Sequence, residues 1–347
     1  MTRQQFLGAA VFSTALLFAG LSGCKPGEEA ATGNTATKPV AIRLAYFPNV
    51  THAPAIIGVA DGTFSKAVAG KATIEPKVFL NGPSEMEALL AREVDIAYIG
   101  PTPAINVFIK TKGDAVRIVS GAASGGAVLV ARADSGITKP EQLVGKRIGT
   151  PQKGGTQDVA ARYYVTQVLK QKLSEQGGST QIIPTDSPQL ATLFEQKALD
   201  AAWMQEPWGA RLIAEQGAKL ILEDRDEWPG KQYATTVIVV RNDFLKSHPE
   251  LVRSIVAAHT EIAARIEADK KAAVAPINAE IKRLTTRGLK DTIIADSLER
   301  ITFTNDSYPA TLQTQADRSF SLGFLGRTKP DLTGLVDASF LPVAASP

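Results

Sequence analysis

Cysteine and histidine are rare in this sequence, and their scarcity excludes several kinds of chemistry. The 347 residues include one cysteine, Cys24, and three histidines. A single cysteine cannot form an internal disulfide, and no spacing of cysteine, histidine and carboxylate residues matches a metal site. His248 and His259 fall at or within an expected helix, and His52 has no acid or nucleophile near it in the sequence. We therefore expect a protein that is not an enzyme and that needs no metal or cofactor.

Neither sign of charge dominates the composition. The 38 lysine and arginine residues nearly balance the 35 acidic residues, which gives a formal net charge of +3. No basic run of the kind that binds nucleic acid is present, so nucleic acid is not an expected partner. After the first residues, no stretch is long and apolar enough to span a bilayer. The length and the 44% of hydrophobic residues predict a globular protein of two domains or one large domain.

The N-terminal segment combines an apolar run with the only cysteine. Arg3 precedes apolar residues 6–21, and the run ends in Leu21-Ser22-Gly23-Cys24. This length and order are typical of a secretory signal peptide. The last four residues resemble a bacterial lipoprotein lipobox, which implies cleavage before Cys24 and lipidation (palmitate) of its sulfur. An uncleaved membrane anchor and an ordinary apolar helix are the alternatives.

The residues after Cys24 are small, polar and interrupted by proline and glycine, which is the composition of a flexible tether. We therefore expect a signal peptide over residues 1–23 and a tether over residues 24–39. The folded part would then be extracytoplasmic and anchored by lipid to a bacterial membrane.

From residue 40 onward, short apolar strands alternate with helical patterns. This alternation favours an α/β fold with parallel sheets and crossover helices. The six expected strands that lead into a loop and a helix cover residues 41–46, 73–79, 94–99, 146–150, 181–184 and 201–204.

Three of the helices that follow these strands have recognisable starting signals. Ser84 with Glu87 forms a capping-box pattern, and Thr102 and Ser187 each precede a proline. We therefore expect Ser84, Thr102 and Ser187 to be N-cap residues. Later in the chain, a helix starting at Pro249 carries a long apolar stripe.

The six junctions form two similar sets of three. Residues 92–98 parallel residues 197–203, and each segment leads to a proline at a helix start. The β-branched runs 125–131 and 235–240 flank the second set and are natural crossovers between two lobes. We therefore predict two α/β lobes with a two-crossover hinge, the first from residues 40–130 and 236–342 and the second from residues 131–235.

The junction loops are rich in neutral hydrogen-bonding side chains, and Lys153 is the only cation in them. In open α/β sheets, ligands bind beyond the carboxyl ends of the strands, next to helix N-termini that favour anions. Each serine or threonine taken alone is explained by helix capping, so the signal is their convergence. The Lys153-Gly154-Gly155-Thr156 order is wrong for a nucleotide phosphate loop.

Two tryptophans flank an acid after the last of these strands. Trp203 and Trp208 can line a cleft against the apolar body of a ligand, while Trp203 on a strand is equally explained as core. Glu206 between them either meets an ammonium group or holds the hinge.

Several segments together resemble the solute-binding proteins of ATP-driven (ABC) importers for sulfonates, nitrate and taurine. They are Ile42–Pro54, Val94–Pro101, Ser135–Ile137 with Glu141–Lys146, and Glu206-Pro207-Trp208. The resemblance extends over nearly all of the chain after residue 40. It implies a type II periplasmic binding protein fold, and Thr51-His52-Ala53-Pro54 is most similar to the aliphatic sulfonate branch.

The resemblance also implies a ligand, a site and partners. The ligand would be a small organic anion such as an aliphatic sulfonate, the partners an importer's permease and ATPase, and the protein a monomer. By position, the implied ligand-binding residues are Asn49, Thr51, His52, Asn81, Ser84, Gly100, Thr102, Gln152, Gly155, Thr156, Trp203 and Glu206.

Other functions stay open at this point. The same scaffold could take nitrate, taurine, bicarbonate or a pyrimidine precursor of thiamine, although the cysteine cluster of some pyrimidine-branch enzymes is missing from this sequence. An exported enzyme with His52 as its base is an alternative of another class, and a signalling or scaffold lipoprotein is a third.

Overall fold

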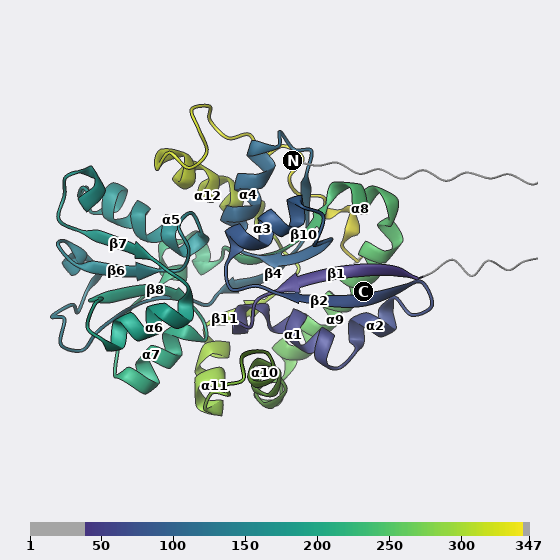
Figure 1. Cartoon of the computed structure of the whole chain (residues 1–347), viewed down its shortest axis with the longest axis horizontal. Coiled ribbons are helices and arrows are strands. Elements are labelled where there is room, and N and C mark those ends of the chain that lie inside the picture. Colours follow the sequence, from purple (N-terminus) through teal and green to yellow (C-terminus); the bar gives the residue numbers. More distant parts are fainter. Residues whose placement is uncertain (1–38, 343–347) are drawn as a thin grey trace, which may run out of the picture. The chain divides into compact units, whose positions relative to one another are not determined.

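The structure is a computed structural model, and it describes residues 39–342. The expected signal peptide, Cys24 and nearly all of the expected tether lie outside these residues. Within residues 39–342, no helix combines the length and the hydropathy needed to cross a membrane. Figure 1 shows two β-sheets, each with its own helices.

The first sheet has six strands in the order β11-β4-β10-β3-β1-β2. The strand β1 pairs in parallel with β2 and β3, whereas β10 runs antiparallel to both β3 and β4, and β11 runs antiparallel to β4. The strands are β1 (Val40–Tyr46), β2 (Ala72–Val78), β3 (Ile96–Ile99), β4 (Val116–Gly125), β10 (Ala234–Arg241) and β11 (Ile301–Phe303).

The second sheet repeats this arrangement with five strands in the order β7-β6-β8-β5-β9. Here β6 pairs in parallel with β7 and β8, and β5 runs antiparallel to β8 and β9. The two predicted α/β lobes are therefore present. The strands are β5 (Ala127–Ala131), β6 (Arg147–Thr150), β7 (Gln181–Pro184), β8 (Ala201–Gln205) and β9 (Lys219–Glu223).

Helices cover both faces of each sheet. The first lobe contains α1 (Ala53–Ala60), α2 (Thr63–Ala67), α3 (Gly82–Leu90), α4 (Pro101–Lys110), α8 (Asn242–Ser247), α9 (Pro249–Ala268), α10 (Lys270–Thr285), α11 (Asp291–Glu299) and α12 (Pro309–Ser321). The second lobe contains α5 (Thr156–Tyr163), which continues as a π-helical turn (Tyr164–Val168), α6 (Ser187–Glu195) and α7 (Trp208–Gln216). Short 3₁₀ turns cover Val50–His52, Pro140–Leu143, Ser174–Gln176, Asp224–Glu227, Pro229–Lys231 and Ala338–Phe340.

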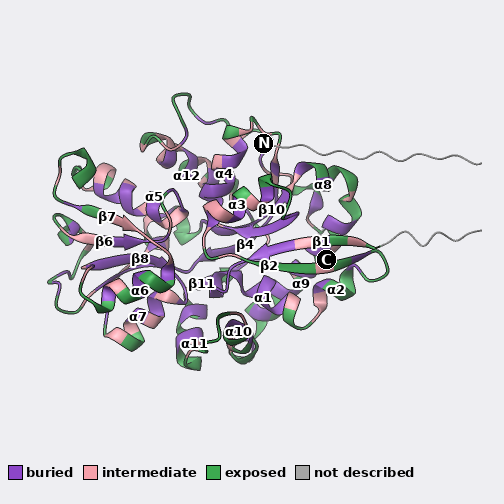
Figure 2. Ribbon diagram, viewed as in Figure 1, coloured by how far each residue is buried: buried purple, intermediate pink, exposed green. Residues whose placement is uncertain are grey.

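The core of each lobe lies on both faces of its sheet. Figure 2 shows that central strands such as β3 and β8 are buried, whereas the edge strand β2 is mostly exposed. Successive side chains of β1 alternate between the two faces, so Leu44 and Tyr46 join one apolar cluster while Ala45 joins the other. The predicted stripe of α9 is confirmed, because Leu251 and Ile262 are buried in the first of these clusters. Burial on both faces explains why central strands such as β3 and β5 are continuous apolar runs.

The chain passes between the sheets at two places. Gly125 ends β4 in the first sheet, and Gly126 precedes β5 in the second; both have φ of +75°. A Cβ atom on Gly125 would lie 2.5 Å from the carbonyl oxygen of Arg300, so glycine is needed here for space as well as for backbone conformation. The chain returns between β9 and β10. Both crossovers exist, and the residue limits of the lobes given above stay a prediction.

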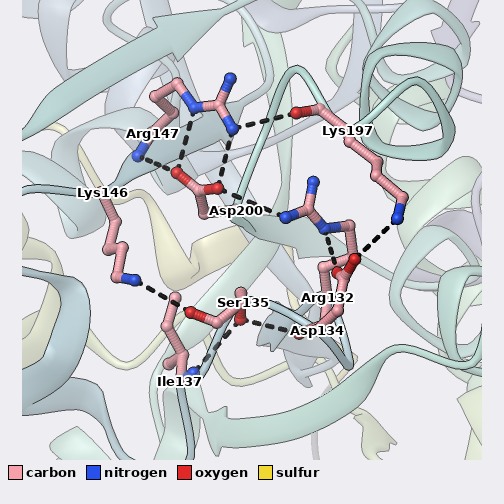
Figure 3. A network of polar contacts seen from close by, with 8 residues as sticks. All are labelled: Arg132, Asp134, Ser135, Ile137, Lys146, Arg147, Lys197 and Asp200. Atoms are coloured by element: carbon pink, nitrogen blue, oxygen red, sulfur yellow. Dashed lines mark hydrogen bonds and ion pairs between the residues drawn. The ribbon is translucent and has the colours of Figure 1, made fainter.

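An arginine–aspartate network at one end of the second sheet explains part of the internal sequence similarity (Figure 3). The backbone N and the Nε of Arg147 donate to Oδ2 of Asp200 over 2.9 and 3.1 Å, and Nη2 donates to the carbonyl of Lys197 over 2.9 Å. Arg132, at the end of the antiparallel strand β5, adds an ion pair to Asp200 at 3.6 Å and one to Asp134 at 2.5 Å.

The first lobe repeats this network with other residues. The backbone N and the Nε of Arg43 donate to Oδ2 of Asp95 over 2.9 and 2.8 Å, and Nη1 donates to the carbonyl of Arg92. Arg241, on the antiparallel strand β10, pairs with Asp95 at 2.7 Å and with Asp243 at 3.0 Å. Equivalent residues therefore hold equivalent strands in both lobes, which supports the similarity of residues 92–98 and 197–203.

The predicted helix starts are wrong by one to three residues. The N-cap of α3 is Asn81, whose Oδ1 accepts from the backbone N of Ser84 over 3.0 Å, and α4 begins at Pro101 after Gly100. Likewise, α6 begins at Ser187 with Asp186 as its N-cap. In α3 and α6 the proline occupies the second helical position, because any residue of the first turn can lack a backbone N–H. Ser84, Thr102 and Ser187 are therefore not N-caps.

Candidate functional site

The junction loops of the two lobes meet in pairs. The loop after β1 contacts the loop after β8, where Val50 N donates to the carbonyl of Glu206 over 3.2 Å. The loop after β2 contacts the loop after β7 through a hydrogen bond of 3.1 Å from Asn81 Nδ2 to Asp186 Oδ1. The loop after β3 faces the loop after β6 at Gly100. All six predicted junctions therefore lie along one contact between the lobes.

Gly100 and Thr156 lie directly against each other across this contact. A Cβ atom on Gly100 would lie 2.5 Å from Thr156 Oγ1, so only glycine allows this approach. The backbone of Gly100 has φ of −62°, which any residue can adopt. Thr156 Oγ1 itself is buried and has no hydrogen-bond partner among the described residues.

The loop that carries Thr156 is held by a buried acid. Asp158 accepts from Gly154 N over 2.9 Å and from Thr150 Oγ1 over 2.9 Å, and it pairs with Arg162 at 2.9 Å. The predicted site residues Gln152 and Gly155 belong to the same loop, closed by a hydrogen bond of 3.0 Å from Gly155 N to the carbonyl of Gln152. Asp158 thus fixes the loop after β6, while Lys153 is exposed.

Two further polar groups beside this contact were missed by the sequence interpretation. Thr235 Oγ1 and Gln205 Oε1 are buried and have no hydrogen-bond partner within residues 39–342. Gln205 is the last residue of β8. Its position at the carboxyl end of a parallel strand could have marked it as a candidate site residue in the sequence. Thr235 is the second residue of the antiparallel strand β10. In the sequence it looks like any β-branched strand residue, so no signal marked it. Thr102 is buried nearby in the first turn of α4.

His52 is buried and neutral. Its ring stacks on Phe47 with centroids 4.5 Å apart, and its Nδ1 accepts from the backbone N of Phe47 over 3.3 Å. Burial lowers the pKa of His52 to about 3, because desolvation disfavours the charged imidazolium. No carboxylate of the described residues bonds to this ring. Thr51 is buried beside it, with its methyl group 2.9 Å from where a Cβ atom of Gly126 would lie.

Glu206 is buried, and protein groups already bind both of its carboxylate oxygens. Oε1 accepts from Arg300 Nη1 over 3.0 Å, and Oε2 accepts from Ala210 N over 2.8 Å and from Ser297 Oγ over 3.3 Å. Desolvation raises the pKa of Glu206, although the hydrogen bond from Ala210 N and the charge of Arg300 oppose this shift. Because Ser297 lies on α11 of the first lobe, Glu206 joins the two lobes.

The two tryptophans have different surroundings. Trp203 is fully buried in the second lobe's core, where its ring lies 5.7 Å from that of Tyr164. Trp208 is half-buried, and its Nε1 donates to Asn49 Oδ1 over 3.2 Å across the lobe contact. Asn49 is therefore bound to the opposite lobe, and Trp208 rather than Trp203 reaches the first lobe.

A cavity of about 620 Å³ adjoins these contacts. Of the twelve predicted ligand-binding residues, Asn49 lines it, while Ser84 is half-buried in the first turn of α3. Phe47, Leu80, Ser187, Trp208 and Ile281 form other parts of the wall. The cavity thus combines aromatic and aliphatic surfaces with charged side chains, Glu195, Glu215, Arg211 and Arg287. Within residues 39–342, no group of three metal-binding side chains occurs.

The chain is similar to known proteins in sequence and in fold. The model of the NMT1-like family matches residues 35–281. The taurine-binding periplasmic protein of Escherichia coli (strain K12) is 27% identical over 204 residues, which cover 58% of this chain and 59% of that protein. The chain thus matches less than two thirds of this relative's length.

Two solved structures share the fold. The periplasmic aliphatic sulphonate binding protein SsuA from Escherichia coli has a TM-score of 0.66 at 18% identity, covering 85% of this chain and 97% of that chain. The periplasmic nitrate-binding protein NrtA from Synechocystis PCC 6803 has a TM-score of 0.74 at 14% identity, covering 87% of each chain. These likenesses confirm the predicted periplasmic-binding-protein fold. Because the family model covers more than half of the sequence, the chain belongs to the NMT1-like family.

Proposed function

We propose that the protein is the extracytoplasmic solute-binding receptor of an ABC importer and that it binds a small organic anion, most favourably an aliphatic sulfonate, between its two lobes. The observation that carries the proposal is the pairing of all six strand-to-helix junctions across one contact. Helix N-termini supply backbone N–H groups and positive dipole ends, which favour an oxyanion without a formal countercharge.

The polar groups near Gly100 suit the sulfonate end of such a ligand. Thr156 and Thr235 carry buried hydroxyls that have no partner within residues 39–342, and a sulfonate oxygen can accept a hydrogen bond from each. Neutral donors of this kind stabilise the anion while leaving it able to dissociate. The alkyl part of the ligand would lie against Phe47 and Trp208 in the adjoining cavity.

The importer would recognise the closed form of the receptor, in which the two lobes enclose the ligand. The membrane permease and its ATPase are the expected partners of the closed receptor. The proposal includes lipidation of Cys24, since a tethered receptor stays concentrated at the membrane that holds its permease. A monomer is sufficient for this role.

The other ligands of this scaffold make different demands. Nitrate and bicarbonate would fill little of a 620 Å³ cavity, whereas taurine needs a partner for its ammonium group. Taurine is the best supported of these alternatives because a relative of this chain bears that name. An enzyme with His52 as base is disfavoured, because its buried ring accepts a backbone hydrogen bond.

The proposal is tested by thermal unfolding of the chain from residue 25 onward with alkanesulfonates, taurine, nitrate and bicarbonate. A ligand that binds only the folded state must stabilise it. At a hundred times its dissociation constant, the expected rise in Tm is about 5–10 °C. We expect this rise with at least one sulfonate and recovery of the ligand unchanged. No rise with any sulfonate would contradict the proposal.

A further inference from the structure

Charged side chains line part of the cavity, and both lobes contribute to them. Arg211 and Glu215 lie on α7 of the second lobe, and Glu195 is the last residue of α6 in the same lobe. Arg287 comes from the first lobe, where it follows α10. None of these four residues is among the ligand-binding residues expected from the sequence, so one arginine of each lobe lines the cavity without an assigned role.

The two arginines share a single acidic partner. Glu215 Oε2 accepts from Arg211 Nε over 2.8 Å, and the same oxygen lies 4.0 Å from Arg287 Nη2. Within residues 39–342, no other carboxylate pairs with either arginine. One carboxylate oxygen therefore serves two guanidinium groups from opposite lobes, and its contact with Arg287 is at the limit of ion-pair distance. Part of the positive charge of the two arginines stays available to a ligand.

Arg211 is held in one orientation by the protein. Its guanidinium lies 5.1 Å from the ring centroid of Trp208, and Trp208 is itself bound to Asn49 of the first lobe. Stacking uses the face of the guanidinium and Glu215 uses its Nε, whereas neither Nη atom has a hydrogen-bond partner among the described residues. A planar fork of N–H donors that is fixed in this way is suited to a carboxylate, which it can bind through two parallel hydrogen bonds.

The exposure of the four charged side chains decides which charge a ligand senses most strongly. The side chain of Arg211 is 14% exposed, against 29% for Glu215 and 70% for Arg287, and Glu195 is exposed as well. Water and salt screen exposed charges, whereas a partly buried charge is screened much less. Although two acids and two bases line the cavity, the least screened of them is therefore the cation Arg211.

We infer that Arg211, assisted by Arg287, recognises a second anionic group on the ligand, which makes the preferred class a sulfocarboxylate rather than a plain alkanesulfonate. This inference rests on the proposed function. With the sulfonate near Gly100, the carboxylate at the other end of the ligand accepts hydrogen bonds from an arginine of each lobe. Such a group favours the closed form, because only there do both arginines reach it. The cavity of about 620 Å³ has room for this longer ligand.

The test compares ligand pairs in which a methyl group is replaced by a carboxylate: ethanesulfonate with sulfoacetate, and propanesulfonate with 3-sulfopropanoate. Calorimetric titration of the full mature chain is expected to show the carboxylate-bearing member of each pair binding about tenfold more tightly, since hydrogen bonds between charged groups are the stronger ones. The preference is expected to shrink as salt is added.

Two variants assign the preference to the arginines. Arg211→Gln removes the charge and the fork of donors, and it is expected to abolish the preference. Arg287→Gln changes an exposed side chain, so it does not endanger folding, and it is expected to reduce the preference about two- to threefold. The matched control is Arg253→Gln on α9, because Arg253 also stacks on an aromatic ring, that of Phe340 at 4.5 Å, but does not line the cavity. It is expected to bind all four ligands as wild type does.

The outcomes separate this inference from the proposed function. If wild type has no preference for the carboxylate-bearing ligands, or if Arg287→Gln or a folded Arg211→Gln keeps the full preference, the inference is wrong while the proposed function stands. If no sulfonate binds, with or without a carboxylate, the proposed function itself fails.

Discussion

Glu206 shows how the sequence can place a residue at the lobe contact and still leave two roles open for it. The sequence left it as either an ammonium partner or a hinge residue. In the structure, both carboxylate oxygens of Glu206 accept hydrogen bonds from protein groups. Two of these donors, Ser297 and Arg300, belong to the first lobe. A carboxylate buried away from water is stable only with such partners. These contacts favour the hinge role, which stays a prediction.

The raised pKa of Glu206 makes the stability of the fold depend on pH. A folded-state pKa above the ordinary value of 4.5 means that the folded protein holds this proton more tightly than the unfolded chain does. The stabilisation is therefore complete below pH 4.5 and is lost as pH rises through the folded-state pKa. The variant Glu206→Gln mimics the protonated form and lacks this loss.

Urea unfolding between pH 4 and 8 measures the effect as a difference. The free energy of unfolding of Glu206→Gln minus that of wild type is expected to increase with pH over this window. Subtracting the two curves removes the contributions of other carboxylates, and Glu250→Gln provides a flat reference. A difference that stays constant across the range would disprove the coupling.

Single residues of the site were predictable where they follow a parallel strand. Asn49, Asn81, Gly100 and Thr156 all lie at the lobe contact, because the carboxyl ends of parallel strands meet at one edge of a sheet. Thr235 was not predictable, since it lies near the start of an antiparallel strand. That strand joins the first sheet only after the chain has passed through the second lobe. Whether these residues bind the ligand stays a prediction.

At the scale of elements, the strands were easier to predict than the helix starts. The expected strand at residues 41–46 matches β1, since an apolar β-branched run buried on both faces has few alternatives. The start of α3 was misplaced, because Asn81 and Ser84 are both good N-cap residues. The sequence does not distinguish them, and in the structure Asn81 is the cap. The starts of α4 and α6 were misplaced as well, so the hydroxyls of Thr102 and Ser187 do not cap their helices.

The start of α5 depends on one buried ion pair. Asp158 and Arg162 are both nearly inaccessible to solvent, and the acid also binds Thr150 and the backbone of Gly154. Replacing Asp158 by alanine leaves the buried guanidinium of Arg162 with only the exposed Glu175, at 2.7 Å, as a partner. The free energy of unfolding is expected to fall by about 3 kcal/mol, the lower end of the loss for a broken buried pair. Denaturant unfolding measures this loss.

An exposed pair gives the comparison for Asp158. Lys231 and Asp226 lie 2.9 Å apart on the surface, with their side chains 69% and 40% exposed. Asp226→Asn is expected to change stability by less than about 1 kcal/mol. Equal losses in the two variants would mean that the loop after β6 does not depend on its buried acid.

At the scale of the whole molecule, the two lobes share one arrangement of strands and one arginine–aspartate network. Arg43 with Asp95 and Arg147 with Asp200 make the same hydrogen bonds in equivalent places. Because the two lobes share this arrangement, their junctions all lie at the carboxyl ends of strands. The junctions pair in reverse order, the first of one lobe with the third of the other. Sequence alternation predicted the lobes, whereas the pairing required the structure.

Arg318 adds a contact between the lobes away from the cavity. It lies on α12, whose Leu312 packs in the first lobe, and its guanidinium lies 4.1 Å from the ring centroid of Trp228 and 4.7 Å from that of Tyr163. Cation–π contacts of this kind stabilise the arrangement in which the junctions face each other.

The central claim is that a solute binds where the lobes close on Gly100. An added Cβ atom there would lie 2.5 Å from Thr156 Oγ1, while the backbone at φ −62° accepts alanine without strain. Gly100→Ala should therefore fold normally but close poorly. Gly288→Ala is the matched control, because its Cβ would meet only the flexible side chain of Lys282 at 3.2 Å.

The decisive measurement is the affinity of wild type, Gly100→Ala and Gly288→Ala for taurine and ethanesulfonate by calorimetric titration. We expect Gly100→Ala to bind the preferred ligand about tenfold more weakly or worse, as overpacking of a tight contact costs about 1–3 kcal/mol. Gly288→Ala should bind as wild type does. Wild-type affinity in Gly100→Ala would contradict binding at the closed lobe contact.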